Sequence, residues 1–166
     1  MITLYNVISR DGFIAQEDGN ENFIPENWWT HTLEMYKCYD SLVMGRTTYE
    51  TMQTYPKSLL EPLEKLSIKK IVITHDEHFQ PKDGYIVAHS PEEAFTDSNI
   101  LVSSGPTLNT FLLEHKLVDA VIFHQLPVEI GEGIRPFSIN TSAHLTFASK
   151  QLLADGVESV RLRPVA

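Results

Sequence analysis

Three segments of the sequence place polar groups that can bind an anion directly after a run of mainly apolar residues. In the first, the run 41–44 leads into Gly45-Arg46-Thr47-Thr48; in the second, the run 100–103 leads into Ser104-Gly105-Pro106-Thr107-Leu108; in the third, the run 71–73 leads into Thr74-His75. Serine and glycine let the backbone approach a ligand closely, and the unpaired N–H groups at a helix start favour negative charge. A guanidinium adds charge-assisted hydrogen bonds. Three such strand ends in one small sheet predict an extended ligand with several phosphates.

Each of these segments also fits an ordinary turn between a strand and the next element. Arg46 would then be solvated, and Thr47 would serve as a helix cap. The single glycine at position 105 is weaker evidence than a glycine-rich phosphate-binding loop. The residues alone therefore leave both interpretations open.

Composition limits the kinds of partner. The chain of 166 residues carries 13 Lys and Arg against 22 Asp and Glu, a net charge of −9. Binding to nucleic acid needs a surplus of basic residues, so it is not expected. No stretch approaches the ~20 apolar residues of a membrane-spanning helix, and the N-terminus has no basic leader. We therefore expect a cytoplasmic protein that binds a small molecule.

Cysteine and histidine usage argues against a metal site. The one cysteine, Cys38, excludes an internal disulfide and a zinc site built on thiolates. The segment His75-Asp76-Glu77-His78 has ligand-type side chains, but it lies in a predicted loop and lacks a third ligand group. We expect no bound metal.

The elements that position these residues alternate along the chain. Mainly apolar runs typical of buried strands occupy residues 2–8, 41–44, 70–74, 85–88, 100–103 and 119–126. Helical patterns lie between several of them: one begins at Pro25 and carries Trp28, Met35 and Tyr39 on one stripe, and the others span 91–95 and 107–115. Alternating strands and helices predict a mostly parallel sheet.

The C-terminal part has a different pattern. Two β-like runs, 144–153 and 157–163, are separated by Ala154-Asp155-Gly156, and Asp-Gly favours a hairpin turn. We therefore predict one α/β domain over residues 1–166, with a mixed sheet that is parallel at its centre and antiparallel at its C-terminal edge, and with helices on both faces. Ligands bind outside the carboxyl ends of the strands in such sheets.

Several motifs resemble those of a known group of reductases. Met44-Gly45-Arg46-Thr47-Thr48-Tyr49-Glu50 resembles the Gly-Arg-x-Thr signature of dihydrofolate reductases and of the related reductase domain of riboflavin biosynthesis. Ser9-Arg10-Asp11-Gly12-Phe13-Ile14-Ala15 is similar to their first loop, and to the riboflavin type in particular. Leu117-Val118-Asp119 and the segment 127–133 also resemble the riboflavin type. The motifs follow the family order over nearly the whole chain.

This resemblance implies the three-layer dihydrofolate-reductase-like fold and NADPH as cofactor. By motif position, Arg46, Thr47 and Thr48, after Gly45, would hold the adenosine phosphates, and Thr74 and His75 would lie beside the 2′-phosphate. The pyrophosphate would contact Ser104, Gly105, Pro106, Thr107 and Leu108; the nicotinamide would contact Val7, Ile14 and Ala15; and the substrate would contact Trp28, Gln125 and Phe137. The implied reaction is hydride transfer to a C=N or C=O bond of a small heterocycle.

One departure bears on the substrate. Dihydrofolate reductases carry an acidic residue on the first helix, and the matching position here is Asn27, whose amide orients a substrate but does not titrate. Glu26 is adjacent, but one helical step of ~100° turns it elsewhere. We therefore expect a reductase of the riboflavin-pathway type with Asn27 at the catalytic position. The alternatives are a dihydrofolate reductase and a nucleotide-binding protein without catalysis. The resemblance also favours a homodimer.

The substitution Asn27→Asp tests the substrate class. If the pocket accepts a pterin, a carboxylate at this position supplies the missing proton route, so activity with dihydrofolate should rise. The measurement is the rate of NADPH oxidation with dihydrofolate for both proteins. An unchanged rate would argue against the pterin interpretation.

Overall fold

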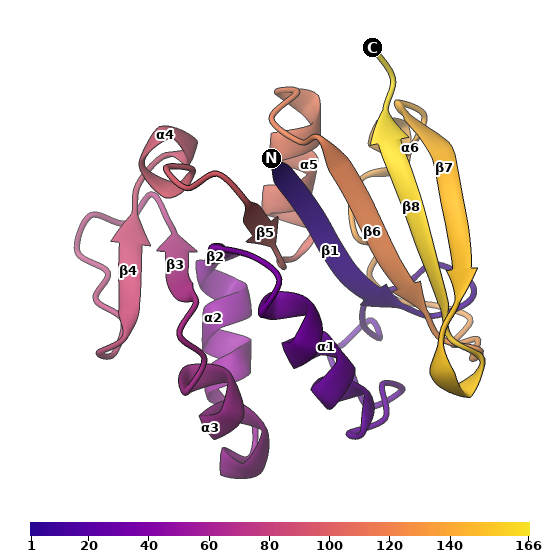
Figure 1. Ribbon diagram of the computed structural model, residues 1–166, viewed down its shortest axis with the longest axis horizontal. Coiled ribbons are helices and arrows are strands. Elements are labelled where there is room, and N and C mark those ends of the chain that lie inside the picture. The colour runs from indigo at the N-terminus through magenta and orange to yellow at the C-terminus, as the bar shows by residue number, and fades with distance from the viewer. The chain divides into compact units, whose positions relative to one another are not determined.

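The computed structural model describes residues 1–166, which form two compact units (Figure 1). The first unit consists of Met1 and residues 26–104, and the second of residues 2–25 and 105–166. Each unit contains four of the eight strands.

The first unit is built on four parallel strands in the order β4-β3-β2-β5. Their bounds are Ser41–Gly45 for β2, Lys69–Ile73 for β3, Tyr85–Ala88 for β4 and Ile100–Val102 for β5. Leu42, Val43 and Met44 are fully buried on successive positions of β2, so both faces of this strand are covered. An unbroken apolar run of this kind is typical of a parallel sheet, which explains why the sequence predicts it.

Four helices belong to this unit: α1 at Trp28–Tyr36, α2 at Arg46–Gln53, α3 at Lys57–Glu64 and α4 at Pro91–Ala94. The buried stripe of α1 is Trp28, Thr32 and Tyr36, spaced four residues apart. The predicted stripe through Tyr39 is wrong because the helix ends at Tyr36. The chain then turns toward the sheet, where the N–H of Asp40 donates to the carbonyl of Asn99. Helix α3 was not predicted from the sequence.

The second unit combines a parallel and an antiparallel part in the order β1-β6-β8-β7. Strand β1, Ile2–Ile8, runs parallel to β6, Ala120–Gln125. Strands β7, Leu145–Leu152, and β8, Glu158–Pro164, form an antiparallel hairpin, and β8 also pairs antiparallel with β6. The short turn η1, Ala154–Gly156, joins them, with Asp155 at φ 56° and Gly156 at φ 74°. Asp-Gly accepts this left-handed geometry readily, so the predicted hairpin is confirmed.

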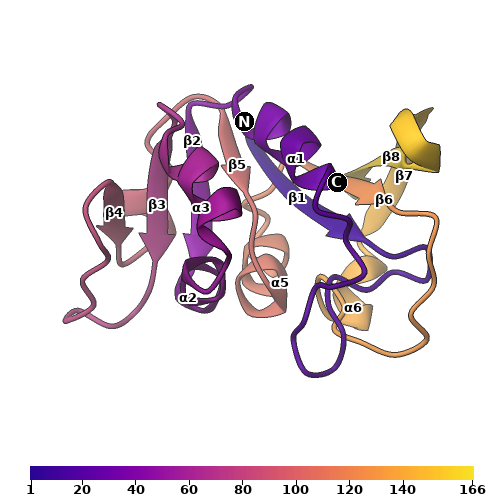
Figure 2. The same cartoon turned by 90° about the horizontal axis from the view of Figure 1, so that it is seen from below.

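Two helices complete this unit. Helix α5 spans Pro106–Glu114 and α6 spans Ile139–Ser142. Both lie on the same face of the strands of their unit, as Figures 1 and 2 show. The predicted α/β architecture, with parallel strands and an antiparallel C-terminal hairpin, is confirmed. The one-domain assignment stays a prediction.

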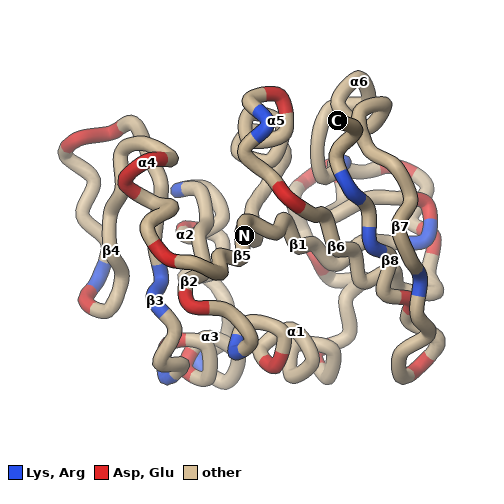
Figure 3. The backbone as a smooth tube through the Cα atoms, turned by 45° about the horizontal axis from the view of Figure 1, so that its top comes forward, with Lys and Arg blue, Asp and Glu red and all other residues tan.

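Both basic and acidic residues occur on elements of each unit (Figure 3). None of the helices has the length and apolar character needed to cross a membrane.

A buried amide pair fixes α5 to β1. Asn109 is fully buried, and its Nδ2 donates to Oδ1 of Asn6 at 3.0 Å and to the carbonyl of Pro136 at 2.9 Å. A buried amide that satisfies its partners in this way orients the groups around it. Asn109 thus ties together a strand, a helix and the loop before α6.

The substitution Asn109→Ala should lower the free energy of unfolding by about 2 kcal/mol, because it leaves a buried carbonyl and a buried amide oxygen without this donor. Urea unfolding followed by circular dichroism measures the change. Asn22 is exposed, so Asn22→Ala should stay within about 0.5 kcal/mol of the parent. Equal effects of the two substitutions would contradict the assigned role.

Candidate functional site

The polar strand ends of the first unit meet at a reversal of strand order. The chain passes from β2 to β3 and then β4, and returns to place β5 on the other side of β2. The carboxyl ends of β2 and β5 are therefore adjacent and leave the sheet in the same direction. Open parallel sheets bind ligands at such a reversal.

Three of the predicted cofactor residues are in contact at this point. The N–H of Gly45 donates to Oγ of Ser104 at 3.0 Å, and Oγ1 of Thr48 lies 3.4 Å from the same oxygen. Ser104 is buried, and Gly45 precedes α2 in an extended conformation without a side-chain cap. The first N–H groups of α2 thus lie beside two hydroxyls. This arrangement suits an anionic oxygen.

Arg46 is held by two carboxylates. Its Nε lies 2.8 Å from Glu50, one NH group lies 2.7 Å from Asp76, and its guanidinium packs over the Phe79 ring. The N–H of His78 is the main cause of the lowered pKa of Asp76, and Arg46 adds to it. The hydrogen bond that Arg46 donates to Glu50 is the main cause of the raised pKa of Arg46. A phosphate at Arg46 would therefore compete with carboxylates already in place.

The other cofactor residues predicted in the first unit, Thr47, Thr74 and His75, make no hydrogen bond to Ser104. Oγ1 of Thr74 accepts from the N–H of Asp76, and its own N–H donates to Ala88. Thr47 and His75 are exposed. The structure therefore brings Gly45, Thr48 and Ser104 together and leaves Thr47 and His75 at the surface.

In the second unit, Asp11 joins two loops. It accepts hydrogen bonds from Oγ of Ser9 at 2.6 Å and from the N–H groups of Ile130 and Gly131. The Ser9 hydroxyl is the main cause of the lowered pKa of Asp11, with the two N–H groups adding to it. Asp11 thus contacts a loop 120 residues further along the chain. No local sequence signal predicts this partner.

The predicted nicotinamide residues lie on both sides of Asp11 in the sequence. Val7 is the penultimate residue of β1 and is half-buried, as is Ile14. Ala15 is buried and pairs with Ile134 in an isolated bridge. Gly133 is required there, since a Cβ at this position would lie 2.2 Å from the Ala15 carbonyl oxygen.

The predicted pyrophosphate residues at the start of α5 form a second uncapped helix end. Gly105 is extended, Pro106 is the first helical residue, and no side chain caps the helix. Thr107 is exposed and Leu108 half-buried. The residues are compatible with an anion, but they make no convergent side-chain contact of the kind seen at Ser104.

The predicted catalytic and substrate residues lie in varied surroundings. Asn27 precedes α1 and is exposed, without a capping bond from its side chain. Trp28 is buried and stacks on His31 at 4.2 Å. Nε2 of Gln125 donates to the Arg10 carbonyl, and Phe137 is buried.

Sequence reasoning missed a buried polar pair on β1 and β6. The hydroxyl of Tyr5 lies 2.8 Å from Nδ1 of His124, and both side chains are buried. Strand register brings them close, because Tyr5 is opposite Ile122 and Val7 opposite His124. Alternation along each run places them on one face, but the register between the runs cannot be read from the sequence.

Comparison with known proteins identifies the fold. No protein-family model matches the sequence. The protein YwjB of Bacillus subtilis, itself uncharacterized, is 26% identical over 161 residues, covering 81% of this chain and 80% of YwjB. A protein of Shewanella sp. PV-4 assigned to riboflavin biosynthesis superposes with a TM-score of 0.72 at 19% identity over 99% of both chains.

Two enzymes of known activity share the same architecture. Enterococcus faecalis dihydrofolate reductase, in complex with NADP(H) and RAB-propyl, has a TM-score of 0.72 at 18% identity, covering 99% of this chain and 96% of the enzyme. The Thermotoga maritima diaminohydroxyphosphoribosylaminopyrimidine deaminase/5-amino-6-(5-phosphoribosylamino)uracil reductase has a TM-score of 0.71 at 16% identity. The match includes 99% of this chain but only 56% of that larger protein.

The Asp11 contacts predict a specific pH dependence. Because the pKa of Asp11 is lowered in the folded state, its ionised form stabilises the fold above the unfolded value of about 3.8 and loses this effect as pH falls through the folded pKa. Asp11→Asn should therefore lower the unfolding temperature at neutral pH, and the difference from the parent should shrink below pH 3.8.

Thermal unfolding at a series of pH values measures this difference. Asp83 provides the control, because it is exposed and has no hydrogen-bond partner. Asp83→Asn should leave the profile unchanged. If the difference in unfolding temperature between Asp11→Asn and the parent stayed constant with pH, the ionised Asp11 carboxylate would not be the stabilising group.

Proposed function

We propose that this chain, which has the fold of dihydrofolate reductase, is an NADPH-dependent reductase of a small heterocyclic compound, of the kind that acts in riboflavin biosynthesis. The fold is shared with enzymes of both types. A shared fold does not fix an activity, so the proposal depends on the site itself.

The observation that carries the proposal is the contact of Gly45, Thr48 and Ser104 at the strand-order reversal. Two hydroxyls and the uncapped start of α2 provide donors at one point, and Ser104 is held there by the Gly45 N–H. These donors fit a phosphate of a dinucleotide. They also explain how an acidic chain with few cations could bind an anion, because backbone N–H groups and hydroxyl groups can take the place of positively charged side chains.

The roles of the other residues follow from the resemblance in their motifs. NADPH would supply the hydride, and the chain would bind and orient it. Thr48 and Ser104 would hold phosphate oxygens, with Arg46 contributing a shared charge, and Val7, Ile14 and Ala15 would line the nicotinamide. Asn27 would donate a hydrogen bond to the substrate or accept one from it. The proton that completes the reduction would come from solvent, because an amide does not titrate.

The amide at position 27 supports the riboflavin-type substrate over dihydrofolate. A reductase that reduces a ring imine by protonating it needs a titratable group, and Asn27 provides none. The matching reaction is the reduction of 5-amino-6-(5-phosphoribosylamino)uracil, the reductase activity for which the Thermotoga maritima protein is named. A fused deaminase step is not proposed, because one cysteine cannot supply its zinc ligands.

The proposal is tested with NADPH and NADH separately. Calorimetry should show binding of NADPH, and absorbance of the reduced nicotinamide should fall when the pyrimidine substrate is added but not when dihydrofolate is added. Binding without turnover on either substrate would favour a nucleotide-binding protein without catalysis. Absence of binding to both nucleotides would overturn the reductase function.

Arg46→Ala gives the residue-level test. We expect NADPH to bind about tenfold more weakly, the lower end for a hydrogen bond to a charged group, because Glu50 and Asp76 already share this guanidinium. Lys57→Ala is the charge-matched control, since Lys57 is exposed and forms no ion pair, and it should leave affinity unchanged. Equal losses in both variants would indicate a general charge effect rather than a phosphate contact.

A further inference from the structure

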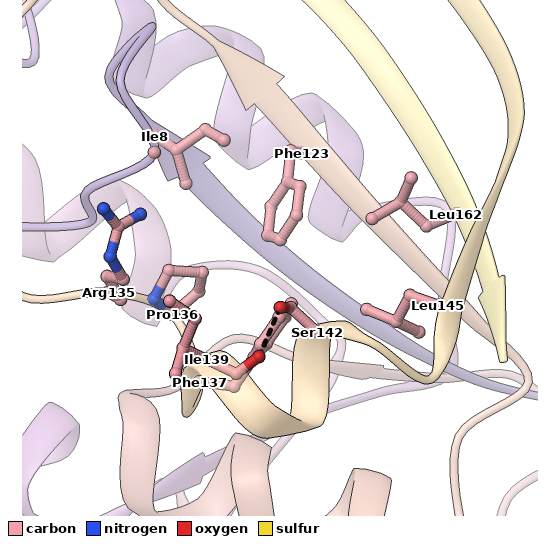
Figure 4. A pocket seen from close by; sticks show the side chains of 10 residues that line it. Ile8, Phe123, Arg135, Pro136, Phe137, Ile139, Ser142, Leu145 and Leu162 are labelled. Carbon is pink, nitrogen blue, oxygen red and sulfur yellow. Dashed lines mark hydrogen bonds between the residues drawn. The ribbon is translucent and has the colours of Figure 1, made fainter.

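The second unit contains a cavity of about 230 Å³ on the face that carries α5 and α6. Ile8, Phe123, Leu145 and Leu162 line it from the strands, and Pro136 and Phe137 line it from the loop before α6 (Figure 4). Strand register explains why these side chains share a face: Leu162 lies opposite Val121, which is two residues from Phe123. The lining is thus mainly apolar and is set by the sheet.

One charged group borders this apolar space. The guanidinium of Arg135 lies at its edge, beside Ile8 and Pro136 (Figure 4). Its carbon packs 4.6 Å from the centre of the Phe13 ring, and the glycine at position 12 leaves room for one NH group, which lies 3.2 Å from where a Cβ would stand. The guanidinium is therefore positioned by an aromatic face and by a residue without a side chain.

Arg135 forms no ion pair, unlike six of the 13 Lys and Arg residues of the chain. The ion pairs of the protein engage Lys37, Arg46, Lys65, Lys69, Lys82 and Lys150. In a chain with 22 acidic residues, an arginine that borders an apolar cavity and forms no ion pair is available to an anion. A guanidinium binds carboxylate and phosphate oxygens through paired N–H groups.

A second hollow of about 570 Å³ shares Arg135, Phe137 and Ile139 with the first. It contains Glu114, whose carboxylate accepts a hydrogen bond from Thr141 at 3.5 Å. Arg135 thus lines both hollows, whereas the carboxylate of Glu114 lines only the second. An anion is accordingly favoured in the first cavity.

The walls are held in place before any ligand arrives. The Pro136 carbonyl accepts from the buried Asn109, and the Ser138 N–H donates to Oγ1 of Thr110. The hydroxyl of Ser142 donates to the Ile139 carbonyl three residues earlier in α6, which fixes the Ser142 side chain at the wall of the cavity. A site fixed in this way loses little freedom on binding.

We propose that this cavity binds a small amphipathic anion, with an aromatic or other ring-sized apolar body against Phe123, Phe137 and Leu162 and a single carboxylate or phosphate on Arg135. The size agrees, since an apolar cavity of about 150 Å³ already holds one benzene ring. The site belongs to the second unit alone and does not depend on the proposed reductase function.

A matched pair of probes separates the two parts of the proposal. 2-Naphthoate and 2-naphthamide share the ring system, and only the first is charged. Titrations of isotope-labelled protein, followed through its backbone amide resonances in the absence of nucleotide, should show 2-naphthoate binding about tenfold more tightly, with shifts concentrated in residues 135–142.

Three variants complete the test. Arg135→Gln should remove the preference for the carboxylate and leave 2-naphthamide affinity unchanged, whereas Arg163→Gln, an exposed arginine on β8, should keep the preference. Ser142→Trp, at an exposed rim position, should fill the mouth and weaken both probes.

Equal affinity for the two probes, a preference that survives Arg135→Gln, or shifts away from residues 135–142 would each overturn the proposal. Because no nucleotide is present, these outcomes are independent of whether the chain is a reductase.

Discussion

The burial of β2 on both faces is the constraint on which the chemistry of the first unit depends. Leu42, Val43 and Met44 have no contact with solvent, so a polar side chain at any of these three positions would lose its hydration. Beyond them, the first position where polar atoms can gather is Gly45, at which the strand ends. Gly45, Thr48 and Ser104 meet there because the neighbouring strand β5 ends beside β2. An apolar core and a polar strand end are thus two results of one packing arrangement.

The second unit solves a different problem, because its loops rather than its strand ends carry the polar contacts. Asp11 gathers N–H groups from a distant loop, and Asn109 satisfies a carbonyl just beyond it. Both side chains fix backbone segments that no helix or strand supports. The same fixed loops hold Arg135 and Phe137 at the edge of an apolar cavity. Polar groups that stabilise loops therefore also determine the shape of a surface where a ligand can bind.

The sequence predicted the strands more accurately than the helices, for physical reasons. Continuous apolar runs such as 41–44 and 85–88 identify strands directly, and Asp155-Gly156 identifies the hairpin. Helix α3 was missed because Pro62 lies inside it, where proline normally argues against a helix. Helix α6 was missed because four residues carry too little periodicity.

The candidate site was predictable in part. The segments at Gly45 and Ser104 were found because strand ends and small residues leave a local pattern. The carboxylate partner of Arg46 at Asp76 and the pairing of Tyr5 with His124 depend on how distant segments come together, and no local pattern encodes that. Asp11 shows the same limit, because its partners at Ile130 and Gly131 could not be read from the sequence.

The close approach at Gly133 has a consequence for how this chain can vary. The Ala15 carbonyl accepts from the Ile134 N–H at 2.8 Å, and a methyl group on residue 133 would occupy the space of that oxygen. Any side chain at this one position would act as a spacer and hold the two loops apart. The distance between the loops is therefore set by the absence of a side chain at Gly133. Replacing this glycine creates a steric clash that added hydrophobic or charged contacts elsewhere cannot relieve.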